Sequence, residues 1–173
     1  GLLTDRTKSI CPPSASRLSV VMRTEETGKP DKSGELSKPS DFLALLPFVQ
    51  SYGVTILDEM PGHIVIEAPF QAALSTPPDL FPASFIGTVG DIAAVSSCNS
   101  LLPAGWACAT LDFTVKMTAQ ARGEKVIARG RVLQNGRNIS VGAADIFTVK
   151  DGMEQLCGSV LASTRNFKIQ SAV

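Results

Sequence analysis

The C-terminal half of the chain alternates apolar and polar residues with a period of two, a pattern typical of β-strands with one buried face. The alternation starts in CATLDFTVKM, and three further strand-like runs follow it. Asn135-Gly136 and Asp151-Gly152 separate the last three runs and favour tight hairpin turns. The four runs are residues 108–117, 124–133, 137–149 and 153–165. The sequence therefore predicts four strands in an uninterrupted antiparallel meander.

Two shorter strand-like runs, VTILDEM and HIVIEAPF, lie on either side of Pro61-Gly62 and predict a β-hairpin. Before them, the apolar residues of DFLALLPFVQSYG predict one short helix over 41–53, whose regularity Pro47 limits.

A Pro-rich loop over 69–84 leads to FIGTVGDIAAVSSCNSLLPAG, which is rich in small residues and ends at Pro103 and Gly105. This segment predicts a buried helix from about 84 to 101. A helix with almost no charge is best buried by a sheet that wraps around it. The predicted fold class is therefore α+β, an antiparallel sheet of about six strands around one long central helix.

Residues 1–38 differ from the rest, because Ser, Thr, Pro, Lys and Glu dominate them. We expect a flexible tail over 1–38 that is dispensable for folding, and a single domain over 39–173. Four basic residues and one acidic residue in the first 23 faintly resemble an organellar transit peptide. We expect a cytoplasmic protein, and this resemblance leaves an organellar matrix as the alternative.

Charge and composition exclude several classes of function. The chain has 16 Lys+Arg and 16 Asp+Glu, so it lacks the basic field that nucleic-acid binding requires. No apolar run reaches the roughly 18 residues of a membrane span. Lys and Arg are absent from 39 to 115 but nine of them lie in 116–173, so an anionic ligand would bind the C-terminal third.

The chain has a single histidine, His63, and four cysteines without a C-x-x-C pair, so we expect no metal site. An enzyme with this composition would work through carboxylates, hydroxyls or backbone amides. Asp91 is the candidate carboxylate, because it is the only ionisable residue between Asp79 and Asp112 and lies inside the predicted buried helix. Either neighbouring hydroxyls such as Thr88 satisfy it structurally, or it has a chemical task.

Four segments are DFLALLPFVQSYGVTILDEMPGHIVIEAPF, FIGTVGDIAAVSS, ATLDFTVKMTAQARGE and ARGRVLQNGRNIS. Together, over roughly residues 41–165, they resemble the hotdog-fold acyl-CoA thioesterases, in particular the phenylacetate-pathway type, which is similar to 4-hydroxybenzoyl-CoA thioesterase. The resemblance implies the hotdog fold, a homodimer or homotetramer, and hydrolysis of a small-molecule acyl-CoA. It implies no cofactor other than coenzyme A as part of the substrate.

In that family a carboxylate on the central helix acts as general base or nucleophile, and it aligns here with Asp91. The family's helix begins with His-Gly-Gly, whose glycine amide polarises the thioester carbonyl, while the carboxylate comes from the partner subunit. These positions are Pro82, Ala83 and Ser84 here, so the resemblance implies oxyanion-binding amides at Ala83 and Ser84. Thr110 matches the Ser or Thr that helps to orient water or the carboxylate.

The phosphates of coenzyme A call for cations, and Arg137, directly after a predicted tight turn, can make charge-assisted contacts with them. Arg131 and Lys125 can assist across a subunit boundary. Two alternatives stay open. One is a hotdog hydratase or dehydratase, which would need His63, although we expect His63 on the surface. The other is a degenerate hotdog protein that binds acyl-CoA or another acyl ligand without hydrolysis, which the Pro82-Ala83-Ser84 replacement favours.

Overall fold

A computed structural model describes residues 37–169 of the chain, in which short helices and a hairpin precede a long helix and four long strands. The helices are α1 (Pro39–Leu43), α2 (Pro47–Ser51), the 3-10 turn η1 (Ala72–Leu74) and α3 (Ala83–Asn99). The strands are β1 (Thr55–Met60), β2 (His63–Pro69), β3 (Trp106–Met117), β4 (Lys125–Asn135), β5 (Ile139–Lys150) and β6 (Met153–Lys168).

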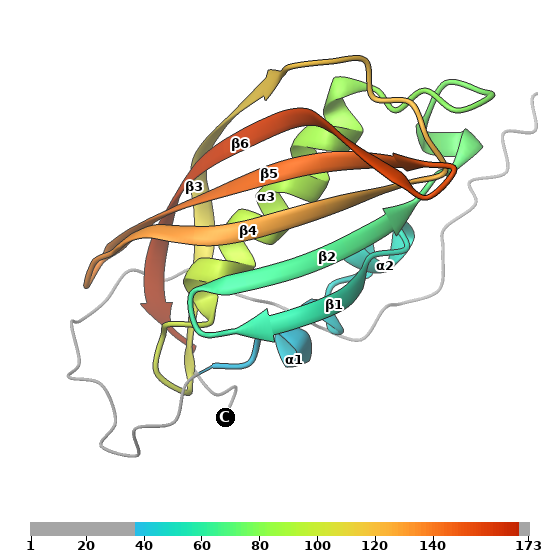
Figure 1. Ribbon diagram of the computed structural model, residues 1–173. Helices are drawn as coiled ribbons and strands as arrows, with labels where there is room; N and C mark the ends of the chain where they lie inside the picture. Colours follow the sequence, from blue (N-terminus) through green and yellow to red (C-terminus); the bar gives the residue numbers. More distant parts are fainter. Residues whose placement is uncertain (1–36, 170–173) are drawn as a thin grey trace, which may run out of the picture.

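The six strands form one antiparallel sheet in the order β1-β2-β4-β5-β6-β3. The sheet curves around α3, and β1 and β3 are its two edges (Figure 1). Twelve of the 17 residues of α3 are buried, which explains why this helix has almost no charge. The predicted α+β class, with a sheet of six strands wrapped around one central helix, is confirmed.

The predicted meander is wrong for β3, which pairs with β6 and not with β4. The β4-β5 and β5-β6 hairpins form as expected at their tight turns. Between β3 and β4, however, the chain has no tight-turn signal, and residues 118–124 carry it past the start of α3, where the Phe81 amide donates to Ala121 O at 2.8 Å. A connection of this length can join strands that are not neighbours in the sheet, so β3 takes the far edge.

The single helix predicted over 41–53 is instead two short helices, because Pro47 begins α2 and forces Leu46 before it into an extended conformation.

The first described residue, Ser37, is already hydrogen-bonded to the domain. The Ser37 amide donates to Leu102 O at 2.8 Å, and its hydroxyl lies 3.0 Å from both Pro103 O and Trp106 O. Within residues 37–169, no helix is long and apolar enough to cross a membrane.

Glycines allow α3 to lie close against the sheet. A methyl group on Gly130 of β4 would collide with Ala93 O, and one on Gly142 of β5 would lie 2.5 Å from Ala94 O. Both glycines therefore place strand backbone directly under the helix turn that follows Asp91. This close contact fixes the position of the central helix relative to the strands.

Candidate functional site

Asp91 and Thr110 meet on the side of α3 that faces the edge strand β3. The Thr110 hydroxyl lies 3.2 Å from Asp91 Oδ1 and 3.1 Å from Oδ2, so its one proton is shared between the two oxygens. Thr88, which the sequence suggested as a structural partner, turns away and donates to Ser84 O at 2.9 Å. The hydroxyl that bonds Asp91 is therefore that of Thr110 and not that of Thr88, because a helical threonine can bond the carbonyl four positions earlier in its own helix.

Asp91 is half-buried, and no ion pair among residues 37–169 includes it. Burial raises the pKa of the Asp91 carboxyl, and the hydrogen bond from Thr110 opposes that rise. A carboxylate with a raised pKa and no cation beside it is a stronger proton acceptor than a surface aspartate. The site can therefore take up a proton or attack an electrophile.

The aromatic ring of Phe113 lies against the same helix, α3, about one turn from this carboxylate. The pairing of β3 with β6 shifts register between Thr110 and Asp112, and Phe113 lies opposite Ala162, which is buried. A methyl group on Gly87 would lie only 3.3 Å from Phe113 Cε2, so the ring lies against α3 about one turn before Asp91. Because β3 is an edge strand, the Phe113 side chain is still 39% exposed and can contact an apolar ligand.

The start of α3 offers unpaired backbone donors. The amides of Phe85 and Ile86 donate to Pro82 O at 3.0 and 3.2 Å, but no acceptor within the described residues pairs with the amides of Ala83 and Ser84. The first turn has no side-chain cap and no acidic residue. Two free N–H groups at the positive end of a helix can bind a developing oxyanion.

Within one chain these amides and Asp91 lie about two helical turns apart. Ser84 and Asp91 are seven positions apart in α3, a rise of about 10 Å. A hydrogen-bond donor and an attacking atom on one thioester carbonyl are no more than about 7 Å apart. Thr88 also lies between them on the same helix face. Within one chain, direct attack by Asp91 on a carbonyl group held by these amides is therefore unfavourable.

The arginines predicted to bind coenzyme A lie away from Asp91. Arg131 points to the outer face of the sheet, where its guanidinium pairs with Asp145 at 2.8 Å, and Lys125 pairs with Glu67 at 2.7 Å. Arg137, at the β4-β5 turn, lines an open hollow of about 290 Å³ together with Leu101, Leu102, Pro103, Trp106, Asn135 and Gly136. The structure does not bring these cations to Asp91 within one chain.

His63 begins β2, and three strands, β4, β5 and β6, separate β2 from β3 in the sheet. It cannot form an acid-base pair with Asp91 inside one chain. Within the described residues, no group of three or more His, Cys, Asp and Glu side chains could hold a metal ion.

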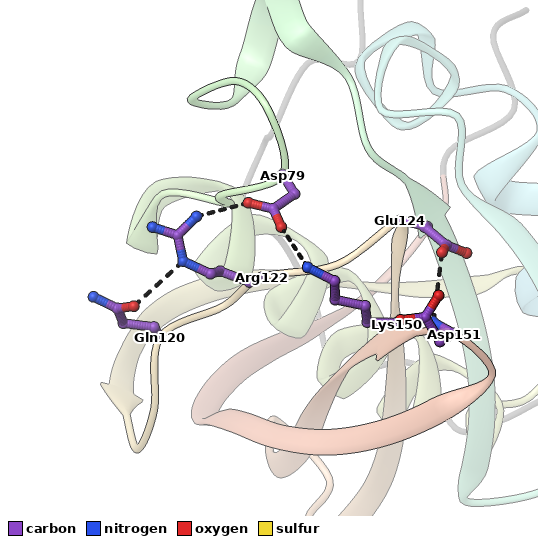
Figure 2. A network of polar contacts seen from close by, with 6 residues as sticks. All are labelled: Asp79, Gln120, Arg122, Glu124, Lys150 and Asp151. Carbon is purple, nitrogen blue, oxygen red and sulfur yellow. Dashed lines mark hydrogen bonds and ion pairs between the residues drawn. The ribbon is translucent and has the colours of Figure 1, made fainter.

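Asp79 has a structural importance that the sequence did not reveal. Its carboxylate accepts hydrogen bonds from Arg122 Nη1 at 2.7 Å and from Lys150 Nζ at 3.0 Å, in the loop that leads to α3 (Figure 2). These partners are 43 and 71 positions away along the chain, so no local pattern could have predicted the contacts.

Solved structures of other proteins have the same architecture. A crystal structure of a thioesterase family protein from Silicibacter pomeroyi superposes with a TM-score of 0.73 and 27% identity, covering 76% of this chain and 96% of that one. The chain has the fold of the thioesterase superfamily. A thioesterase from Haemophilus influenzae matches at a TM-score of 0.67 and 20% identity, covering 76% of this chain and 90% of that one.

A protein from a phenylacetic acid degradation operon has the same fold. The E. coli PaaI protein from the phenylacetic acid degradation operon matches with a TM-score of 0.66 and 15% identity, covering 77% of this chain and 93% of that one. No family model matches the sequence. No curated protein matches it either. What these structures share with the chain is the hotdog fold.

Proposed function

We propose that this protein is an acyl-CoA thioesterase with Asp91 as its catalytic carboxylate. The observation that carries the proposal is the pair of Asp91 and Thr110 on the central helix of a thioesterase-like fold, at hydrogen-bond distances of 3.1 and 3.2 Å. Burial raises the pKa of Asp91, which suits a group that accepts a proton during hydrolysis.

Two chemical routes fit this carboxylate. As general base, Asp91 takes a proton from water, the hydroxide adds to the thioester carbon, and collapse of the tetrahedral oxyanion expels the coenzyme A thiolate, which recovers the proton. As nucleophile, Asp91 displaces the thiolate to form a mixed anhydride, which water then hydrolyses. Borohydride added during turnover would reduce such an anhydride to homoserine at position 91, and this product separates the two routes.

We propose that the site is shared between two copies of the chain, because the amides of Ala83 and Ser84 lie about two helical turns from Asp91 of the same copy, too far for direct attack by Asp91 on a carbonyl group that they hold. An edge strand with exposed apolar side chains supports this assembly, since Leu111 and Phe113 of β3 are 56% and 39% exposed. We propose a homodimer, or a homotetramer built from such dimers. Light scattering that finds only monomer at micromolar concentration would rule out the shared site.

Coenzyme A is the proposed carrier of the acyl group, with Arg137 and Arg131 as contacts for its phosphates from the partner copy. The proposed compartment is a reducing one, the cytoplasm in the first place. Cys98, Cys108 and Cys157 support this, because all three are free of disulfide bonds.

The decisive experiment measures thiol release from short, long and aromatic acyl-CoAs by the wild type and Asp91→Asn. The substitution keeps the side-chain volume but removes the basicity, so we expect the rate to fall at least about 10²-fold. Asp112→Asn is the matched control, because Asp112 is exposed on β3, the strand that carries Thr110, and has no ion pair within the described chain. An Asp91→Asn rate within about threefold of wild type would contradict the assignment.

The second candidate function is acyl-CoA binding without hydrolysis. The start of α3 favours it, because Ala83 and Ser84 stand where a glycine amide would allow the closest approach of a carbonyl. This function predicts no thiol release by the wild type and equal acyl-CoA affinity in the wild type and Asp91→Asn, measured by calorimetry.

A further inference from the structure

The loop before α3 is held by one carboxylate. Asp79, four positions before the helix begins at Ala83, accepts hydrogen bonds from Arg122 at 2.7 Å and Lys150 at 3.0 Å. Figure 2 shows Asp79 between these two cations, which come from the β3-β4 connection and from the end of β5. One side chain therefore links three separate segments of the chain.

Backbone contacts bring the same segments together. Asp79 O accepts from the Gly123 amide at 3.0 Å, and the Phe81 amide donates to Ala121 O at 2.8 Å. Gln120 Oε1 accepts from Arg122 Nε at 3.3 Å, which orients the guanidinium toward Asp79 (Figure 2). Up to the start of α3, the loop therefore lies alongside the β3-β4 connection and is hydrogen-bonded to it.

The positive charges of Arg122 and Lys150 favour the ionised form of Asp79. The hydrogen bonds from Lys150 and then from Arg122 hold the pKa of the Asp79 carboxyl below its usual value, so it stays ionised. A second contact lies nearby, where Glu124 Oε1 accepts from the Asp151 amide at 3.5 Å, and it does not involve the loop (Figure 2). Within the described residues, Asp79 is the only ionised side chain of the loop that is bonded to the connection.

The start of α3 follows this loop directly, and the helix has no side-chain cap of its own and two first amides that are unpaired within the described chain. We propose that Asp79 is a positioning residue: by holding Arg122 and Lys150 it fixes the amides of Ala83 and Ser84 where a thioester oxygen would bind. This inference rests on the proposed function. It assigns the placement of the oxyanion-binding amides to a residue that does not touch the substrate.

The test compares Asp79→Asn with Glu154→Gln. Glu154 is the matched control, because it also accepts two charged hydrogen bonds, from Arg129 at 2.8 and 2.9 Å, but neither residue belongs to the loop before α3 or to the β3-β4 connection. We expect kcat for acyl-CoA hydrolysis to fall about 10- to 100-fold in Asp79→Asn with KM within about twofold of wild type, because misplaced amides act in the transition state. Glu154→Gln should change neither constant.

Two further measurements separate positioning from simple loss of stability. In a double-mutant cycle, the losses in kcat caused by Asp79→Asn and Arg122→Gln should not add, since both break one contact. Hydrogen–deuterium exchange should become faster in Asp79→Asn over residues 85–89 and stay unchanged over β2.

The outcomes distinguish this inference from the proposed function. If the wild type hydrolyses acyl-CoA, Asp91→Asn does not, and Asp79→Asn keeps its kcat, then the positioning role is wrong and the thioesterase function stands. If the wild type releases no thiol, the thioesterase function is wrong, and exchange decides the role of Asp79. Unchanged exchange over residues 85–89 in Asp79→Asn overturns it in either case.

Discussion

The position of Asp91 depends on how closely α3 approaches β4, and Gly130→Ala tests this directly. Gly130 lies under the helix carbonyl of Ala93, two residues after Asp91. An added methyl group would lie 2.6 Å from the Ala93 carbonyl carbon and 3.1 Å from Ile64 Cγ2. Since carbon atoms pack at about 3.5 Å or more, α3 must move away from the sheet by on the order of 1 Å.

The expected cost follows from two opposing effects. Overpacking of a core costs about 1–3 kcal/mol, whereas replacing glycine by alanine restricts the unfolded chain and returns about 0.4–1 kcal/mol. A net loss of about 1–2 kcal/mol lowers Tm by roughly 2–8 °C for a chain of this size. Displacement of the carboxylate by about 1 Å should also reduce kcat by as much as about 10²-fold.

Calorimetry and thiol-release kinetics on the same samples measure both effects. Gly62→Ala is the control, because Gly62 has a φ of +79° and an added methyl would meet only Leu101, at 3.5 Å. Left-handed strain should cost it about 1–2 kcal/mol without moving α3, so its kcat should stay at the wild-type value. A Gly130→Ala protein with unchanged Tm and kcat would refute the close contact, and one with lower Tm but full kcat would show that this contact does not position Asp91.

Two more predictions concern the site and the domain boundary. Thr110→Val removes a hydrogen bond that lowers the pKa of Asp91, so that pKa should rise further; the acid limb of the kcat/KM profile should move to higher pH, and kcat/KM at neutral pH should fall about tenfold. An acid limb that stays in place would mean that Thr110 does not act on Asp91. Deletion of residues 1–36, which keeps the hydrogen bonds of Ser37, should leave Tm within about 1 °C, because the tail has too little apolar surface to offset its ordering entropy. A drop of many degrees would place part of the tail on the core.

The elements of this fold were predictable from the sequence because their signals are local. A period of two marks each strand, Asn135-Gly136 and Asp151-Gly152 mark two hairpins, and an uncharged run of small residues marks the buried helix. Asp91 stood out for the same reason, as an ionisable residue inside an apolar helix. Each of these features depends on residues a few positions apart, so burial and hydrogen bonding impose a pattern that can be seen in one stretch of sequence.

Only the tertiary structure decided which of these elements meet. The place of β3 beside β6 depends on a connection without a turn signal, and the contact of Thr110 with Asp91 joins residues 19 positions apart. The link from Asp79 to Arg122 and Lys150 spans 43 and 71 positions. Such contacts form when packing of α3 against the sheet brings distant segments together, and neither partner needs a distinctive local sequence for that. Asp91 was therefore visible in the sequence as a candidate carboxylate and Thr110 through the family resemblance, whereas their contact and the contacts of Asp79 were decided by the fold.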